Sequence, residues 1–151
     1  MDHVEDDEIL YRRVPSQEKY YKIDSNDPNT IRVSSQAFTD RNQRPSVDRA
    51  SLCNHKPQYS QQESTDGVVS LVTNQVRQID SIIQNDQKGK EEFKYKIDVL
   101  PRPLDENKAH AQIEPSPEYR NQKPFRKLLE RLAYLANERG WEIKPQIDNS
   151  S

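Results

Sequence analysis

Alternation of apolar and polar positions predicts several short strands. Residues 31–38 and 95–99 alternate with a period of two, which is typical of strands with one buried face. Residues 68–72 (VVSLV) are rich in β-branched side chains, which favours a buried strand. Two further short strands are predicted over 109–113 and 141–143.

The clearest helical pattern lies near the C-terminus. Pro124 suits the first turn of a helix, and Gly140 stands where a left-handed C-terminal cap belongs. A shorter helix is predicted over about 74–84, where apolar residues recur at steps of four and three. The apolar stripe of the C-terminal helix consists of Phe125, Leu128, Leu129, Leu132 and Ala136.

Polar stretches separate these elements. Residues 16–30 and 46–67 are predicted as loops, and residues 85–92 as a turn around Gly89. Residues 1–8 carry five acidic and no basic residues, so we expect a solvated, disordered tail. Residues 9–145 would then form a single domain, followed by a frayed end at 146–151.

Together these patterns predict an α+β fold. The sheet would be small, mixed or antiparallel, and covered on one face by the C-terminal helix, with long polar loops. Only 31% of the 151 residues are hydrophobic, so the core must be thin.

Composition excludes several classes of protein. No apolar run approaches the roughly 20 residues of a membrane helix, and the acidic N-terminus does not resemble a signal peptide, so we expect a cytoplasmic protein that does not bind membranes. The single cysteine, Cys53, cannot form an internal disulfide. Only three glycines are present, and no phosphate-binding loop is recognisable. We therefore expect no nucleotide cofactor or other cofactor.

A metal site is not expected either. Cys53 and His55 form a Cys-x-His pair, but a closed zinc site needs two more ligands at suitable spacing, and the sequence shows none. Cysteine chemistry would require Cys53 to lie near His55 or His110 with a lowered pKa.

His110 is the candidate catalytic residue, together with Asp48. If Ala109, Ala111 and Ile113 face the core, His110 shares the other face of its strand with Glu114. A histidine beside a carboxylate can act as a general acid or base. The alternative is that the second face of the strand is exposed to solvent and that His110 has no catalytic role.

Hydroxyl and carboxylate side chains gather around one strand end and the loop after it. These residues often form turns and caps, because their side chains bond nearby backbone groups. The functional alternative is a polar pocket whose rim faces Arg12 or Arg13, which are suited to binding phosphate or carboxylate. The candidate binding residues of this group are Ser34, Ser35 and Ser46.

The C-terminal segment carries a local excess of positive charge. Lys127 and Arg131 lie four residues apart and share a helix face that could contact nucleic-acid phosphates. A solvated basic face is the commoner explanation. The 23 basic and 25 acidic residues give a formal charge of -2, which argues against a dedicated nucleic-acid-binding protein.

Four short motifs occur in order between residues 10 and 114: LYRRVP (10–15), SSQAF (34–38), PSVDRAS (45–51) and ENKAHA (106–111). This succession resembles a family of small, uncharacterised bacterial proteins with the pattern R-R-I-x-P, S-S-x-A-F, S-V-D-x-A-S and N-P-A-H-A. Lys108 departs from the pattern, since proline is usual there. The resemblance implies a grouping without a mechanism, and it suggests that Arg12, Arg13, Ser34, Ser35, Phe38, Ser46, Asp48 and His110 cluster in space.

Two functional hypotheses follow. The first is a non-catalytic protein-interaction or accessory module of a bacterial cytoplasmic system, because signatures of catalysis are missing. The alternative is a small enzyme, toxin or defence effector that acts on a phosphate-bearing nucleotide or nucleic acid. In that case Arg12 or Arg13 would bind phosphate and His110 would transfer the proton.

Overall fold

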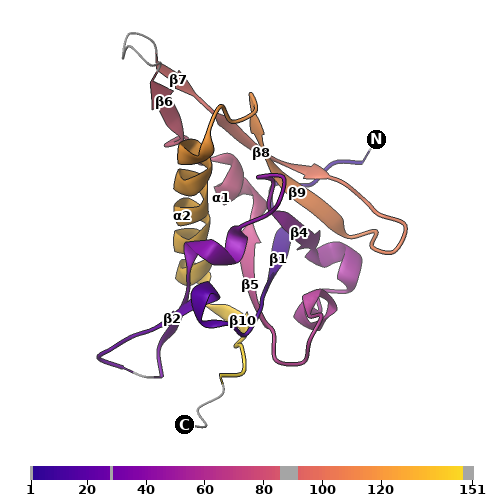
Figure 1. The fold of residues 1–151 in the computed structure, drawn as a ribbon. Helices are drawn as coiled ribbons and strands as arrows, with labels where there is room; N and C mark the ends of the chain where they lie inside the picture. The colour runs from indigo at the N-terminus through magenta and orange to yellow at the C-terminus, as the bar shows by residue number, and fades with distance from the viewer. Residues whose placement is uncertain (1, 28, 86–91, 148–151) are drawn as a thin grey trace.

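The computed structural model describes residues 2–27, 29–85 and 92–147, shown as a ribbon in Figure 1. The strands are β1 (Ile9–Val14), β2 (Tyr21–Ile23), β3 (Ile31–Val33), β4 (Ser46–Arg49), β5 (Gly67–Val72), β6 (Ile83–Asn85), β7 (Glu92–Lys94), β8 (Lys96–Pro101), β9 (His110–Ser116) and β10 (Trp141–Ile143). The helical elements are the 3₁₀ turns η1 (Glu18–Tyr20), η2 (Ser35–Phe38), η3 (Ala50–Cys53) and η4 (Pro57–Ser60), and the α-helices α1 (Thr73–Arg77) and α2 (Gln122–Arg139).

A six-stranded sheet organises the fold. Its strand order is β10-β5-β1-β4-β9-β8, and every neighbouring pair is antiparallel. The pairs β2-β3 and β6-β7 form two small additional sheets. This architecture confirms the α+β class with an antiparallel sheet.

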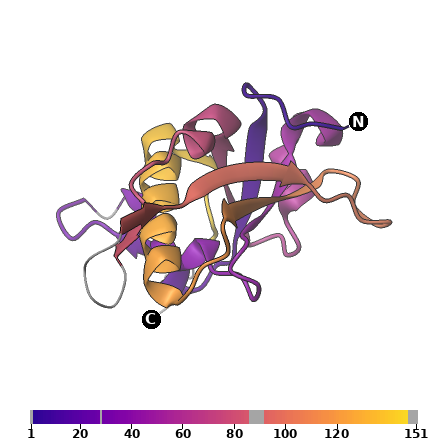
Figure 2. The same cartoon turned by 90° about the horizontal axis from the view of Figure 1, so that it is seen from above.

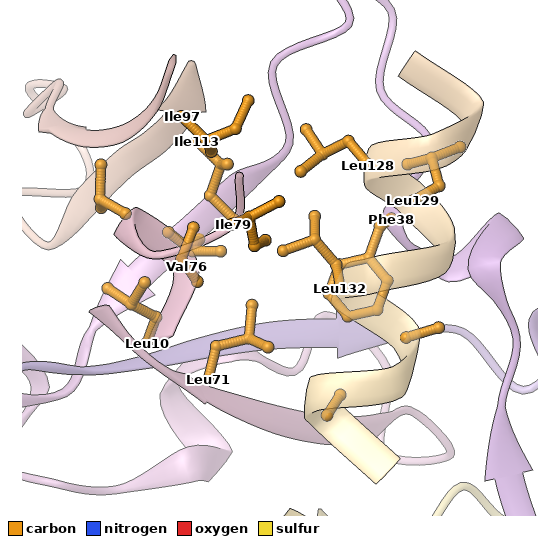
Figure 3. Packing of buried hydrophobic residues seen from close by; sticks show 14 of the residues in the cluster. Leu10, Phe38, Leu71, Val76, Ile79, Ile97, Ile113, Leu128, Leu129 and Leu132 are labelled. Carbon is orange, nitrogen blue, oxygen red and sulfur yellow. The ribbon is translucent and has the colours of Figure 1, made fainter. Parts of the chain in front are cut away.

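Helix α2 covers one face of the large sheet, as predicted (Figure 2). The Asn121 side chain accepts a hydrogen bond from the Lys123 backbone N–H and caps the helix, and Gly140 ends it with a φ of 85°. The predicted apolar stripe is buried against the sheet, where Leu132 faces the side of β5 that carries Leu71 (Figure 3). Burial of this stripe fixes which face of the sheet stays available to solvent and ligands.

The opposite face of the sheet carries a smaller apolar cluster. Tyr11 and Val68 lie there with Ala50 and Cys53 from η3. Because successive side chains of a strand point to opposite faces, Tyr11 is on this side while Leu10 is on the α2 side. The candidate site lies beside this second cluster.

Four local predictions were wrong. The loop expected over 16–30 contains η1 and β2, and β2 pairs with β3. The strand expected over 31–38 ends at Val33, and η2 then turns Phe38 into the core between the sheet and α2. The loop expected over 46–67 contains the inner strand β4, which has only one large apolar side chain, Val47. The helix expected over 74–84 is limited to α1, which ends at Arg77; Ile79 and Ile82 are buried in the core outside any helix, and β6 begins at Ile83.

The acidic N-terminal segment is held against the fold, although most of its side chains remain exposed. Val4 is fully buried in the core, and Glu8 is 7% exposed. Asp2 and Asp6 form ion pairs of 2.8 Å with Arg49 and 2.7 Å with Arg77. The expectation of a disordered tail is therefore wrong for residues 2–8, since buried basic partners compensate the charge run.

Near the C-terminus, the Gln146 backbone N–H donates a hydrogen bond to the Thr65 carbonyl. Residues 148–151, and the turn expected around Gly89, lie outside the described residues. None of the described helices is both long and apolar enough to cross a lipid bilayer.

Candidate functional site

A pocket of about 570 Å³ opens where β1 and β4 separate. The two strands pair only as far as Tyr11 and Asp48, and beyond this point they diverge. The lining comes from β1, η2 and the residues after it, β4, η4, the 104–107 turn and β9. Five of the sequence-predicted site residues line it: Arg12, Arg13, Ser46, Asp48 and His110.

Sheet register brings Tyr11, Asp48 and His110 together. Asp48 is the register partner of Tyr11 in β1 and of His110 in β9, so the three positions form a row across adjacent strands. Tyr11 is only 5% exposed, and its hydroxyl makes no hydrogen bond within the part of the chain that the structure describes. Burial, together with Glu142 and other acidic neighbours, raises the pKa of Tyr11, so the hydroxyl stays protonated.

Asp48 is held in place by two neutral donors. The Ser60 hydroxyl donates to one carboxylate oxygen at 2.6 Å, and the Asn107 amide donates to the other at 2.8 Å. The Asn107 carbonyl oxygen in turn accepts a hydrogen bond from the Tyr59 hydroxyl. A carboxylate has about four acceptor positions, so Asp48 keeps capacity for a ligand.

His110 is oriented by the backbone. Its Nδ1 lies 2.8 Å from the carbonyl oxygen of Arg102. A carbonyl only accepts hydrogen bonds, so Nδ1 carries the proton and Nε2 of the neutral ring is an acceptor. The carboxylate expected to assist His110, Glu114, binds the Arg102 guanidinium instead, at 2.8 Å.

Arg12 is a structural residue. Its guanidinium donates to the backbone carbonyls of Ala37, Thr39 and Ser46 at 2.8 to 3.0 Å, and it lies 3.6 Å from an Asp40 oxygen. These contacts connect β1 to the end of η2 and to β4. Most N–H donors of Arg12 are therefore occupied, which argues against the expected role as a phosphate ligand.

Arg13 is also partnered. Its Nε lies 2.5 Å from Asp66, whose side chain is 2% exposed. The same carboxylate oxygen accepts hydrogen bonds from the backbone N–H groups of Gln62 and Glu63. Burial by itself would raise the pKa of Asp66, but these bonds outweigh it and hold the pKa below its ordinary value.

This depressed pKa predicts a specific acid sensitivity. Because Asp66 has a lower pKa in the folded state than in the unfolded chain, its contribution to stability is complete above about pH 4 and is lost as pH falls through the folded pKa. Asp66→Asn should lower the free energy of unfolding at pH 7 by about 1–3 kcal/mol and flatten its pH dependence below pH 4. Urea titrations between pH 2.5 and 7 measure both effects. A variant as acid-sensitive as the wild type would contradict this role of Asp66.

The other predicted binding residues do not line the pocket. Ser34 bonds to backbone groups, since its hydroxyl donates to the Lys19 carbonyl and its N–H to the Tyr20 carbonyl, as a turn-forming residue does. Ser35 begins η2. On α2, the Lys127 ammonium donates to the Ile83 carbonyl, and the Arg131 guanidinium lies 5.2 Å from the Tyr134 ring centre. The expected cluster is thus correct for Arg12, Arg13, Ser46, Asp48 and His110. It is wrong for Ser34 and Ser35, and for Phe38, which is buried in the core.

Cys53 belongs to the smaller apolar cluster. It is 4% exposed, and its thiol donates to the Arg49 carbonyl, whereas His55 is exposed. No group of three or more His, Cys, Asp or Glu side chains suited to a metal ion is found among the described residues.

The Cys53 thiol is predicted to be unreactive in the folded protein. Burial, with smaller effects from Asp48 and Glu8, raises the pKa of Cys53 to about 11. At pH 8 the thiolate fraction is then on the order of one in a thousand. Ellman's reagent should therefore react at least about 100-fold more slowly with the native protein than with the urea-unfolded protein. Equal rates would show that the thiol is accessible and ionised.

Comparison with protein-family models, curated proteins and solved structures finds no match to this chain. The resemblance to a bacterial family therefore stays a prediction.

Sequence reasoning missed several site residues. Asn107 belongs to the ENKAHA motif, but its role depends on a turn that brings it 2.8 Å from Asp48, 59 positions away. Tyr59 and Ser60 lie in a stretch interpreted as a loop. Tyr11 could have been found, because it alternates with Arg13 on the same strand face.

Proposed function

We propose that this protein is a non-catalytic interaction module that recognises a partner protein through the pocket between β1 and β4. One observation carries the proposal: Tyr11, Asp48 and His110 meet in register on one pocket, and internal hydrogen bonds fix two of these side chains. Preorganised polar groups in a concave site are typical of binding sites. We extend the proposal to an accessory role in a bacterial cytoplasmic system; the resemblance suggests the bacterial grouping and supplies no mechanism.

The surroundings of the pocket also fit a protein partner. Leu104, which lines the pocket, is 41% exposed, and Tyr59, whose hydroxyl binds the lining residue Asn107, is 44% exposed. Tyrosine is enriched at protein interfaces because it combines a large apolar surface with a polar end. These side chains place apolar surface beside a polar pocket.

Blocking the pocket tests this proposal. Gln62 lines the pocket and is exposed, so Gln62→Trp would narrow the pocket without removing any side-chain contact described above. Gln75→Trp, on the exposed side of α1, introduces the same side chain elsewhere. Capture from a lysate of the source organism should retain the same protein with the wild type and Gln75→Trp, and lose it with Gln62→Trp. Retention by all three would contradict the pocket as the recognition site.

The fixed tautomer of His110 favours a second candidate function, a small enzyme acting on a phosphate-bearing substrate, as a toxin or defence effector. A neutral imidazole that lines a pocket, with Nε2 unprotonated, is suited to act as a general base. The wild type and a His55→Gln control would then turn over nucleotides or RNA, and His110→Gln would not. Absence of turnover by the wild type would exclude this candidate for the substrates tested.

A further inference from the structure

We infer that the surface covered by the acidic segment, residues 2–8, is a second docking site, which binds an acidic segment of a partner protein that has an apolar residue between two acidic ones. In the structure the chain's own segment occupies this site. Arg49 and Arg77, which pair with the segment, do not line the pocket between β1 and β4. The inference therefore goes beyond the function proposed above.

The acidic segment is held through every second residue. The Asp2 carboxylate accepts a hydrogen bond from the Arg49 guanidinium at 2.8 Å. Val4, two positions further on, is fully buried in the main core. Asp6, again two positions further on, accepts a hydrogen bond from Arg77 at 2.7 Å. The side chains between these three positions are exposed, so the pattern that the site recognises is acidic-x-apolar-x-acidic.

The cations of this site belong to the body of the protein, and the acids lie largely in water. The Arg49 side chain is 8% exposed, and that of Asp2 is 57% exposed. For Arg77 and Asp6 the exposed fractions are 16% and 69%. Arg77 also binds the Asp98 carboxylate at 2.8 Å and a backbone carbonyl of β8, so these bonds can hold its guanidinium in place without the segment. A buried cationic surface of this kind is complementary to any acidic segment that reaches it.

One donor of the site is left unsatisfied by the chain's own segment. The Nε of Arg49 is buried and makes no hydrogen bond with any described residue, although a Glu8 oxygen lies 3.5 Å away. Both Glu8 oxygens are engaged by Ser51, through its hydroxyl and its backbone N–H. A buried donor without an acceptor is costly. A segment that places a carboxylate oxygen on this Nε would therefore bind better than the resident one.

A segment of another protein suits the site better than the same segment of a second copy. The Glu8 carbonyl accepts hydrogen bonds from the N–H and the hydroxyl of Thr73, so the chain is anchored directly after the segment. The six residues 2–7 span at most about 20 Å, and an exchange between two copies would press their bodies together. An exposed loop or tail of a partner has no such restriction.

Peptide binding to the full chain tests the inference. Val4→Ser removes the apolar contact and should release the acidic segment, which would speed hydrogen exchange of the Asn74 amide, the donor to the Asp6 carbonyl. Asp2→Asn combined with Asp6→Asn changes only exposed carboxylates and releases the segment in a second way, in case Val4→Ser perturbs the core. The probe is a fluorescent peptide with the sequence of residues 2–8, followed by anisotropy.

The peptide should bind both variants at least about tenfold more tightly than the wild type, in which the attached segment competes at a high effective concentration. It should also restore slow exchange at Asn74. A peptide carrying Val4→Ser or Asp6→Asn should bind at least about fivefold more weakly. The matched control is a peptide carrying Asp7→Asn, which has the same net charge as the Asp6→Asn peptide and should bind like the unchanged one. Asp7 is exposed and forms no ion pair within the part of the chain that the structure describes.

Three results would overturn the inference. Unchanged exchange at Asn74 in both variants would show that the acidic segment is a fixed part of the fold. Equal weakening by Asp6→Asn and Asp7→Asn in the peptide would show that only net charge is recognised. A dimer of the variants that forms with rising concentration and dissociates when the peptide is added would assign the site to a second copy of the chain.

A further variant keeps this site distinct from the pocket of the proposed function. Gln62→Trp, introduced together with Val4→Ser, narrows the pocket and should leave binding of the peptide unchanged. Loss of peptide binding in this double variant would place the peptide in the pocket and would also overturn the inference. Capture of the partner by the single variant Gln62→Trp would still decide the proposed function.

Discussion

Replacing Arg12 with methionine should lower the free energy of unfolding by about 3–5 kcal/mol. The substitution leaves three backbone carbonyls, of Ala37, Thr39 and Ser46, without their charged donor. Each lost hydrogen bond to a charged group costs about 1.5–3 kcal/mol, and some of this is recovered where water enters the open pocket. Urea unfolding followed by circular dichroism gives the value directly.

The neighbouring arginine provides a matched control. Arg13→Met removes the same side chain one position along β1, but its partner Asp66 keeps two backbone hydrogen bonds, and the Arg13 side chain is 31% exposed. We therefore expect a smaller loss, of about 1–2 kcal/mol. Arg12→Lys should resemble Arg12→Met, because one ammonium cannot reach three separated carbonyls. Equal losses for the Arg12 and Arg13 variants would refute a special structural role of Arg12.

Elements with a strong local signal could be predicted from the sequence. Helix α2 combines an apolar stripe with favourable residues at both ends, so local propensity and burial agree, and the structure confirms it. Strand β5 is equally clear, since its β-branched side chains are buried on both faces.

The errors arose where tertiary contacts decide the local structure. The alternating pattern that ends at Phe38 predicted a strand. In the structure η2 turns the Phe38 side chain into the core beneath α2, where it is buried among apolar side chains. Strand β4 carries Ser46 and Asp48 on its pocket side, and these polar residues hide the strand pattern. The polar side chains of the candidate site thus obscured the strand pattern of β4.

The candidate site could be predicted only in part, for a related reason. Residue type suggested that Arg12, Arg13, Asp48 and His110 gather in one place, and the pocket brings them together. Their roles depend on partners distant in sequence: Arg12 bonds to carbonyls up to 34 positions away, and Arg13 to a carboxylate 53 positions away. These distant partners determine whether the guanidinium of an arginine is free for a ligand or is occupied by groups of the same chain. The sequence alone does not show them.

Arg49→Met is predicted to have an effect of similar size to Arg12→Met, through the N-terminal segment. The Arg49 side chain is 8% exposed and forms ion pairs with Asp2 at 2.8 Å and Glu8 at 3.5 Å. Removing one member of a buried pair costs about 3–5 kcal/mol, because the other charge stays buried without compensation. Here that charge belongs to Glu8, which is 7% exposed.

Local hydrogen exchange distinguishes this mechanism from a general loss of stability. The backbone N–H groups of Thr73 and Asn74 donate to the carbonyls of Glu8 and Asp6, so release of the N-terminal segment should expose them first. In Arg49→Met their exchange should accelerate more than that of the amides in the middle of α2. Arg41→Met, which removes an exposed arginine, should change the stability by less than about 0.5 kcal/mol.

A double variant isolates the role of the Glu8 charge. Glu8→Gln retains an acceptor for Ser51 but removes the charge, so Glu8→Gln combined with Arg49→Met should be more stable than the sum of the two single losses predicts. If the loss of stability in the double variant equals the sum of the two single losses, the Glu8 carboxylate would already be neutral or hydrated in Arg49→Met. In that case the acidic segment would be held mainly by the burial of Val4, and ionic compensation would contribute little to its packing.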